Sequence, residues 1–181
     1  MELDERELAV ALHALTSAGI LLQTGVIPDA SFEFKHALLR DIAYQTLLRS
    51  DRERLHRRFA ELASAGVIGE MGHLPELLAI HHSLGGNPKE SVALWLKAGQ
   101  EAIKRSANHE ALEQLSKGLE DCEALARSDP AAAERAELGL LTALPAPLIA
   151  VSGWSSPELE RTYARAMELG NRHGSDEARF H

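Results

Sequence analysis

Histidine is the residue type in this chain best suited to metal binding or acid–base chemistry, and nine are present among the 181 residues. Imidazole binds transition metals and titrates near neutral pH. The adjacent pair His81-His82 is the obvious candidate. Neighbouring residues on a helix point about 100° apart, however, so they cannot both face one ion as histidines at i and i+4 can. We therefore expect no metal site here, and instead one partly buried and one exposed histidine.

Two other segments resemble catalytic motifs only superficially. Residues 85–91 (GGNPKES) lack the glycine that precedes lysine in a P-loop, and they carry a proline where an amide would face a phosphate. Residues 152–156 (SGWSS) do not match the G-x-S-x-G nucleophile elbow and do not follow a strand pattern. We interpret the first as a helix end, a turn and a new helix start, and the second as a loop anchored by Trp154. The sequence thus predicts no catalytic residue and no cofactor, and hence a protein that is not an enzyme.

A basic stretch could contact phosphates instead. Between Lys35 and Glu61 there are seven Lys/Arg and four Asp/Glu, whereas the whole chain has a formal net charge of -8. The overall charge opposes general attraction to nucleic acid. Mixed-charge amphipathic helices usually expose a solvated face or an interdomain contact, so Arg54 and Arg57 are candidate partner-binding residues. Nucleic-acid binding through residues 35–58 is kept as the alternative hypothesis.

The number of cysteines and the hydropathy of the sequence indicate the cellular compartment of the protein. Cys122 is the single cysteine, so no internal disulfide is possible. The first six residues are mostly charged, and no stretch approaches the roughly 18 uninterrupted apolar residues of a membrane span. We therefore expect a cytoplasmic protein without membrane contact.

The elements that carry these residues are predicted to be helices. Alanine and leucine are abundant and only 4% of residues are aromatic, which favours helix packed on helix. Capping residues precede proline at Asn87, Asp129 and Ser156, and Ser50 with Glu53 has capping-box spacing. We expect helices at about 4–18, 36–48, 51–65, 75–85, 88–105, 108–126, 131–144 and 157–171.

The segment 19–35 is the exception to the helical pattern. Two short apolar runs flank a turn-rich stretch, which favours a β-hairpin. A helix followed by a hairpin is typical of the end of a winged-helix module. We therefore expect two domains, a winged-helix-like remnant over 1–50 and a helical repeat region over 51–181.

The helical repeat prediction depends on one tetratricopeptide (TPR) pattern, W-x2-L-G-x2-Y followed by A-x3-F. The pattern is matched with small residues in place of leucine and tyrosine, by Trp95, Ala98, Gly99, Ala102, Ala111, Leu115 and Gly118. Small residues let two antiparallel helices approach closely, and we expect Trp95 to fill the seam between neighbouring pairs. The fold class predicted is therefore all-α, an α-solenoid of TPR-like antiparallel pairs with the small hairpin at its N-terminal side.

Further pairs are expected on either side of this repeat. Residues 51–65 with 75–85 form a degenerate earlier pair, and the helices at 131–144 and 157–171 form a weaker later one, joined by a long loop over 145–155. Three pairs are the minimum for a stable solenoid. An uncovered repeat face makes a homodimer one of the expected assemblies.

Four segments also resemble a known protein family. Residues 32–44 (FEFKHALLRDIAY) with 54–58 (RLHRR), and the later segments 94–99 (LWLKAG) and 158–166 (ELERTYARA), are similar to bacterial signalling ATPases of the adenylate/guanylate cyclase-associated and LuxR-like regulator type. The resemblance implies that a longer protein carries the ATPase or cyclase chemistry elsewhere. It implies for this chain a winged-helix tail followed by TPR-like repeats.

The expected function is therefore non-catalytic. A curved repeat surface presents successive first-helix residues along one groove, where Gln100 and Lys104 are the candidate partner-binding residues. The expected partner is a protein or peptide, or the longer protein's own ATPase domain, in a regulatory or scaffolding role.

Overall fold

The structure is a computed structural model that describes residues 4–26, 30–67 and 74–177. The chain divides into two compact units, Met1–Arg52 and Glu53–His181. The sequence predicts a boundary after residue 50, two residues before the observed boundary after Arg52.

The first unit consists of two helices and a β-hairpin. Its elements are α1 (Glu5–Ser17), β1 (Leu21–Thr24), β2 (Ser31–Phe34) and α2 (Ala37–Thr46). The strands pair antiparallel with Leu21 opposite Phe34, so the predicted hairpin is confirmed. Leu21 is the buried hydrophobic residue among those described in this unit, and the apolar side chains of α1 and α2 are largely exposed.

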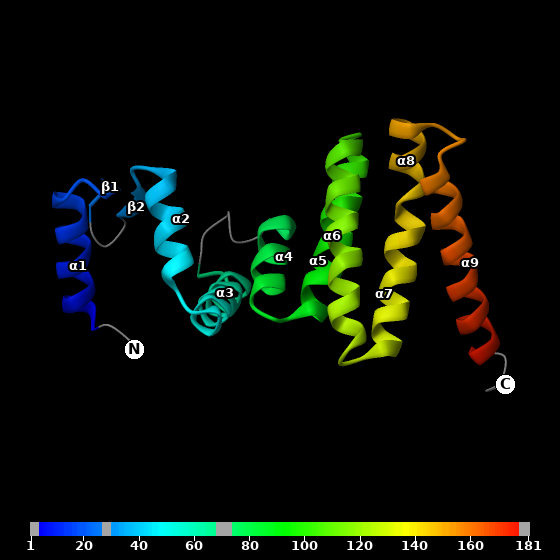
Figure 1. The fold of residues 1–181 in the computed structure, drawn as a ribbon, viewed down its shortest axis with the longest axis horizontal. Helices are drawn as coiled ribbons and strands as arrows, with labels where there is room; N and C mark the ends of the chain where they lie inside the picture. Colours follow the sequence, from blue (N-terminus) through cyan, green and yellow to red (C-terminus); the bar gives the residue numbers. More distant parts are fainter. Residues whose placement is uncertain (1–3, 27–29, 68–73, 178–181) are drawn as a thin grey trace. The chain divides into compact units, whose positions relative to one another are not determined.

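The second unit is helical. Its elements are α3 (Arg49–Ser64, whose first turn belongs to the first unit), α4 (Pro75–Leu84), α5 (Pro88–Lys104), α6 (Asn108–Ala126), α7 (Pro130–Ala143), α8 (Pro145–Ser152) and α9 (Pro157–Glu177). From α4 to α7 each helix runs opposite to the one before it, and α9 returns beside α7 and α8 (Figure 1). The mainly helical character expected from the sequence is therefore confirmed.

Three of the predicted helix starts lie where the sequence placed them. Asn87, Asp129 and Ser156 each precede a first-turn proline. The Asp129 carboxylate accepts from the Ala132 N–H at 3.0 Å, and the Ser156 hydroxyl accepts from the Glu158 N–H at 3.2 Å. These side chains satisfy N–H groups that have no partner within the helix.

Several boundaries differ from the prediction. The expected capping box at Ser50 is wrong because α3 already begins at Arg49. The expected end of the last helix near residue 171 is also wrong, since α9 continues to Glu177. Trp154 does not anchor its loop, because its side chain is 78% exposed.

The long loop expected over 145–155 is largely a helix, α8. Leu144 has helical dihedral angles, and the Leu148 N–H donates to its carbonyl at 3.1 Å. The two prolines lie in the first turn of α8, where a backbone N–H would have no acceptor within the helix, so its absence costs no hydrogen bond. Burial of Pro147 and Leu148 in the core favours the helix over a loop.

Together α7 and α8 form an apolar helical stretch over Pro130–Ser152, 23 residues that contain an 18-residue window with a mean hydropathy of 1.2. By length and composition alone this stretch could cross a membrane. Four of its leucines lie in the core cluster that also contains residues of α6 and α9. These leucines are Leu140, Leu141, Leu144 and Leu148.

Small residues set the distances between the central helices. All seven residues of the predicted repeat signature are buried. A Cβ on Gly99 would lie 2.6 Å from Leu115 on α6, and a Cβ on Gly118 would lie 2.8 Å from Leu140 on α7. Both distances are far below van der Waals contact, so only glycine permits this approach of α5 to α6 and of α6 to α7.

A partly buried carboxylate connects three helices around Trp95. Asp121 of α6 accepts from the Trp95 indole N–H at 3.0 Å, the Ser91 hydroxyl at 2.7 Å and the Ser83 hydroxyl at 2.8 Å. Trp95 and Ser91 are almost completely buried on α5, and Ser83 belongs to α4. Buried polar groups need a partner, so these hydrogen bonds, together with the apolar contacts, determine which faces of the three helices meet.

Replacing Gly99 by alanine should destabilise the protein. Alanine normally favours a helix interior over glycine, but here the added Cβ would overlap Leu115. We expect the free energy of unfolding to fall by about 1–3 kcal/mol in chemical denaturation. Gly170→Ala in α9 is the control, because nothing lies within 4 Å of a Cβ at that position. It should be neutral or stabilising, and equal effects of the two substitutions would contradict the close approach.

Replacing Asp121 by alanine should remove the shared acceptor. The buried Trp95 N–H would lose its partner, and Ser91 would retain only the Pro88 carbonyl. We expect a loss of about 2–3 kcal/mol in the free energy of unfolding. Glu120→Ala, at an exposed position beside it on α6, should change stability by no more than about 0.5 kcal/mol. An Asp121→Ala variant as stable as the Glu120→Ala variant would refute the role of the carboxylate.

Candidate functional site

Among the concave regions formed by the described residues of the second unit, two that differ in character are large enough to hold a ligand. One, of about 460 Å³, lies between α6, α7 and α9 and is called the α6–α7–α9 pocket. The other, of about 380 Å³, lies between α5 and the α7–α8 stretch and is called the α5–α7 groove. They differ in whether their charged residues form ion pairs with other residues of the protein.

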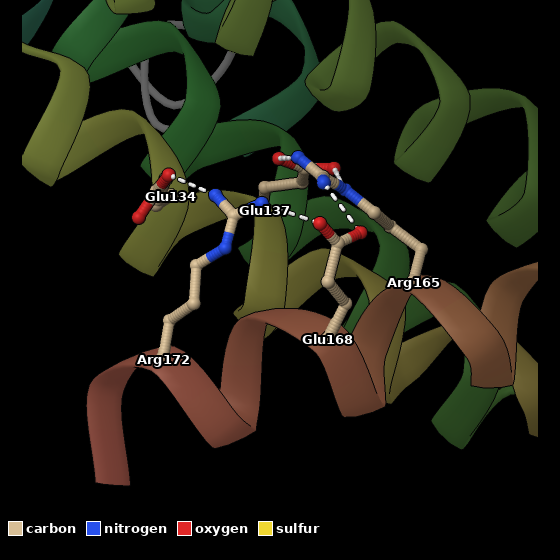
Figure 2. A network of polar contacts seen from close by, with 5 residues as sticks. All are labelled: Glu134, Glu137, Arg165, Glu168 and Arg172. Atoms are coloured by element: carbon tan, nitrogen blue, oxygen red, sulfur yellow. Dashed lines mark hydrogen bonds and ion pairs between the residues drawn. The ribbon is translucent and has the colours of Figure 1, made fainter. Parts of the chain in front are cut away.

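Three charged residues in the wall of the α6–α7–α9 pocket, Arg165, Glu137 and Glu134, form ion pairs, and Glu123 is the charged wall residue outside this network. The Arg165 guanidinium donates to both carboxylate oxygens of Glu137, at 2.7 and 2.9 Å, and to Glu168 at 2.9 Å. Arg172 bridges Glu168 and Glu134 (Figure 2). These bonds raise the pKa of Arg165 and lower that of Glu168. The ion-pair network therefore connects α7 to α9 and leaves little unpaired charge for a ligand.

Cys122 lies in the wall of the same pocket. Burial, and next the nearby carboxylates of Glu137 and Asp121, raise the pKa of its thiol to about 12. At neutral pH the thiol is protonated, whereas nucleophilic cysteines need thiolate character. The pocket therefore lacks an activated nucleophile at this position.

The α5–α7 groove is lined by the two residues that the sequence proposed. Gln100 and Lys104 of α5 lie across from Gly139, Thr142 and Ala143 of α7. Ile103 and Ala146 complete the wall. The structure therefore brings the predicted first-helix residues together with a second helix in one concavity.

Two of the three polar side chains of this groove have no partner in the described part of the protein. Gln100 and Lys104 are exposed and make no hydrogen bond or ion pair with any residue that the structure describes. Thr142 donates its hydroxyl to the Gly139 carbonyl at 2.8 Å, so its lone pairs can still accept. Unpaired donors beside an apolar floor are the usual composition of a binding site.

Two more cations extend the groove along its helices. Lys97 lies three residues before Gln100 and seven before Lys104, and therefore on the same face of α5. Arg135 lies four residues before Gly139 and seven before Thr142, and therefore on the same face of α7. Both side chains are exposed and unpaired with the described residues. Sequence reasoning missed them, although the i, i+3 and i+4 spacing from the candidate residues would have indicated them.

The two arginines proposed from the basic stretch lie elsewhere. The Arg57 guanidinium donates to the Gly85 carbonyl at 3.0 and 3.2 Å and so caps the end of α4. Arg54 is exposed on α3 and is not part of either concavity. Of the remaining basic residues, Arg40 pairs with Asp41 and Arg58 with Glu61. The structure therefore does not bring Arg54 and Arg57 together with Gln100 and Lys104.

The histidines of α3 and α4 form a small cluster. The Nδ1 atoms of His56 and His81 are 3.1 Å apart, and the His81 ring stacks on Phe59 with centroids 3.8 Å apart. His81 and His82 are both partly buried, so the expectation of one exposed histidine is wrong. No group of three or more His, Cys, Asp or Glu suited to a metal occurs within residues 4–26, 30–67 and 74–177.

Apolar side chains are exposed on α9 and in the loop before it. Tyr163, Met167 and Trp154 are the largest of them. The expectation of a homodimer through an uncovered repeat face stays a prediction, since such a surface fits a following helical pair equally well.

Comparison with known proteins finds few matches. No family model matches the chain, and no solved structure matches it. An uncharacterized protein of Rhizobium meliloti (strain 1021) is 34% identical over 169 residues. That similarity covers 91% of this chain but 16% of the relative, so the chain spans about one sixth of the length of the relative that it matches.

The histidine cluster should make stability depend on pH. Burial, and next the neighbouring His56 and His82, lower the pKa of His81 in the folded protein below 6.5. The unfolded chain therefore takes up this proton first as the pH falls, and stability is lost below about pH 6.5. We expect the wild-type Tm to fall between about pH 7.5 and 5.5, and His81→Gln to reduce this fall.

His109→Gln is the matched control for this measurement. His109 is exposed on α6, outside the cluster. Its substitution should leave the pH dependence of the Tm as in the wild type. A His81→Gln variant whose Tm falls as steeply as that of the wild type would contradict the assignment.

Proposed function

We propose that this chain is a non-catalytic, TPR-like repeat region that binds a peptide segment in the α5–α7 groove. The observation that carries the proposal is that Gln100 and Lys104, chosen from the repeat pattern, line one groove together with α7. A repeat protein binds with such first-helix residues, because successive pairs present them side by side.

The packing of the second unit supports a repeat arrangement. Helices α5 and α6 form one antiparallel pair, and α7 with α9 forms the next (Figure 1). The first helices of the two pairs, α5 and α7, also contact each other. The earlier pair would be α3 with α4, which approach closely at the end of α4, where a Cβ on Gly85 would lie 2.9 Å from the Arg57 backbone.

The setting that we propose is a longer bacterial signalling protein of the ATPase-linked type. This part of the proposal depends on the resemblance of residues 32–44 and 94–99 to such proteins. A relative whose length greatly exceeds that of this region fits a module within a multidomain chain. In that setting the bound segment would belong either to a partner protein or to the ATPase module of the same polypeptide.

Filling the groove should abolish peptide binding. Ala146 is exposed and lines the groove, so Ala146→Trp places a large side chain there without disturbing the core. We expect linear peptides selected on the wild-type chain from a random displayed library to bind this variant at least about tenfold more weakly, as hot-spot changes do. Fluorescence anisotropy with labelled peptides measures the affinity.

The matched control introduces the same side chain at a distant exposed alanine. Ala164 lies on α9 and lines neither concave region. Ala164→Trp should bind the selected peptides as the wild type does. If the library yields no binder, or if both tryptophan variants bind equally well, the groove is not the peptide site.

A further inference from the structure

We propose that the α5–α7 groove selects an extended segment with acidic residues about three positions apart. The inference rests on the proposed function, since it names the chemistry of the segment that the same groove binds. It follows from three features of the groove: its unpaired cations, its mixed floor and the spacing of its charges.

The charge of the groove is opposite to that of the protein. The chain carries a net charge of -8, yet the groove wall contains no acidic residue and includes Lys104. Lys97 and Arg135 continue the two helical stripes that border it, and neither pairs with a residue that the structure describes. Complementary charge attracts an acidic ligand and opposes a basic one.

Several other cations in the same unit are engaged, whereas three unpaired ones lie together on the α5 and α7 stripes. Arg165 and Arg172 pair with glutamates of α7 and α9, and Lys117 pairs with Glu113 at 2.7 Å. Arg105, directly after α5, pairs with Glu110 at 2.9 Å. A ligand carboxylate would find its unpaired partners on the stripes of the α5–α7 groove rather than at these pairs.

The floor of the groove favours a peptide over a simple anion. Ile103, Ala143 and Ala146 supply apolar surface, while the Gln100 amide and the Thr142 hydroxyl are placed to bond a peptide backbone. A volume of about 380 Å³ accommodates several side chains and exceeds the size of a single carboxylate or phosphate. The combination suits an extended chain that carries both apolar and acidic side chains.

The spacing of the cations predicts the spacing of the acids. Lys97 and Lys104 are seven residues apart on α5, which corresponds to about 10 Å along a helix axis. A segment in the polyproline II conformation rises about 3.1 Å per residue, so about three residues span the same distance, and with three residues per turn its side chains at i and i+3 lie on one face. Acidic side chains at positions i and i+3 of the bound segment would therefore meet one lysine each.

Three labelled peptides test the inference on the intact chain. The first has two aspartates at i and i+3 in an alanine–leucine background, the second has asparagines and the third has lysines at the same positions. We expect the aspartate peptide to bind at least about tenfold more tightly than the asparagine peptide, and the lysine peptide to bind most weakly. Added salt should reduce the preference for aspartate.

Charge-neutral variants identify the residues responsible. Lys104→Gln should weaken binding of the aspartate peptide about threefold, and Lys97→Gln/Lys104→Gln about tenfold, with little effect on the asparagine peptide. Arg127→Gln removes the same charge at an exposed position outside the groove, at the end of α6, and should leave both affinities unchanged. An aspartate preference that all these variants lose equally would reflect overall charge and would overturn the inference.

The remaining outcomes separate this inference from the proposed function. If the aspartate and asparagine peptides bind equally well and Ala146→Trp blocks both, the groove binds peptides without selecting acidic ones. If neither peptide binds, and Ala146→Trp does not weaken the binding of the peptides selected from the library, both proposals fail. Tighter binding of a single-stranded oligothymidylate than of the aspartate peptide would assign the cations to nucleic acid instead.

Discussion

The hydrogen bond from the buried Trp95 indole to the Asp121 carboxylate is the interaction on which the rest of the second unit depends. A tryptophan that is 2% exposed must find an acceptor for its N–H, and the carboxylate that accepts this bond also accepts from Ser91 and Ser83. Three helices are therefore held in one register. Within this frame α6 can present Gly118 to Leu140 of α7, which in turn positions α7 beside α5.

The distribution of charge pairs divides the second unit into a side where the charges are paired and a side, the proposed binding groove, where cations are unpaired. Between α7 and α9 the arginines and glutamates satisfy one another, and Glu137 and Arg165 stabilise the contact of these helices. Along the α5–α7 groove the cations of α5 remain without partners among the described residues. Paired charges contribute to stability or rigidity, whereas unpaired ones on an exposed concave surface are available to a ligand.

Helical starts, the hairpin and the small-residue signature could be predicted because each depends on local spacing. Asn87 and Asp129 before proline define helix starts directly, and Trp95 with Gly99 indicates a close helical crossing. The helix α8 could not be predicted in this way, because burial of Pro147 and Leu148 outweighs the local signal of two prolines. The same limit applies to the site. Gln100 and Lys104 follow from the repeat pattern, whereas the contribution of α7 depends on which helix packs against α5.

Gly139 permits the close approach of α5 and α7 beside the groove. A Cβ at this position would lie 3.3 Å from the Leu96 side chain of α5, closer than ordinary contact. Alanine there would require the Leu96 methyl group to shift by a few tenths of an ångström, and a bulkier residue would require more space between α5 and α7. One position in the sequence therefore sets the width of the groove, and a single substitution there could change the range of ligand sizes it accepts while the cations along its rim stay the same.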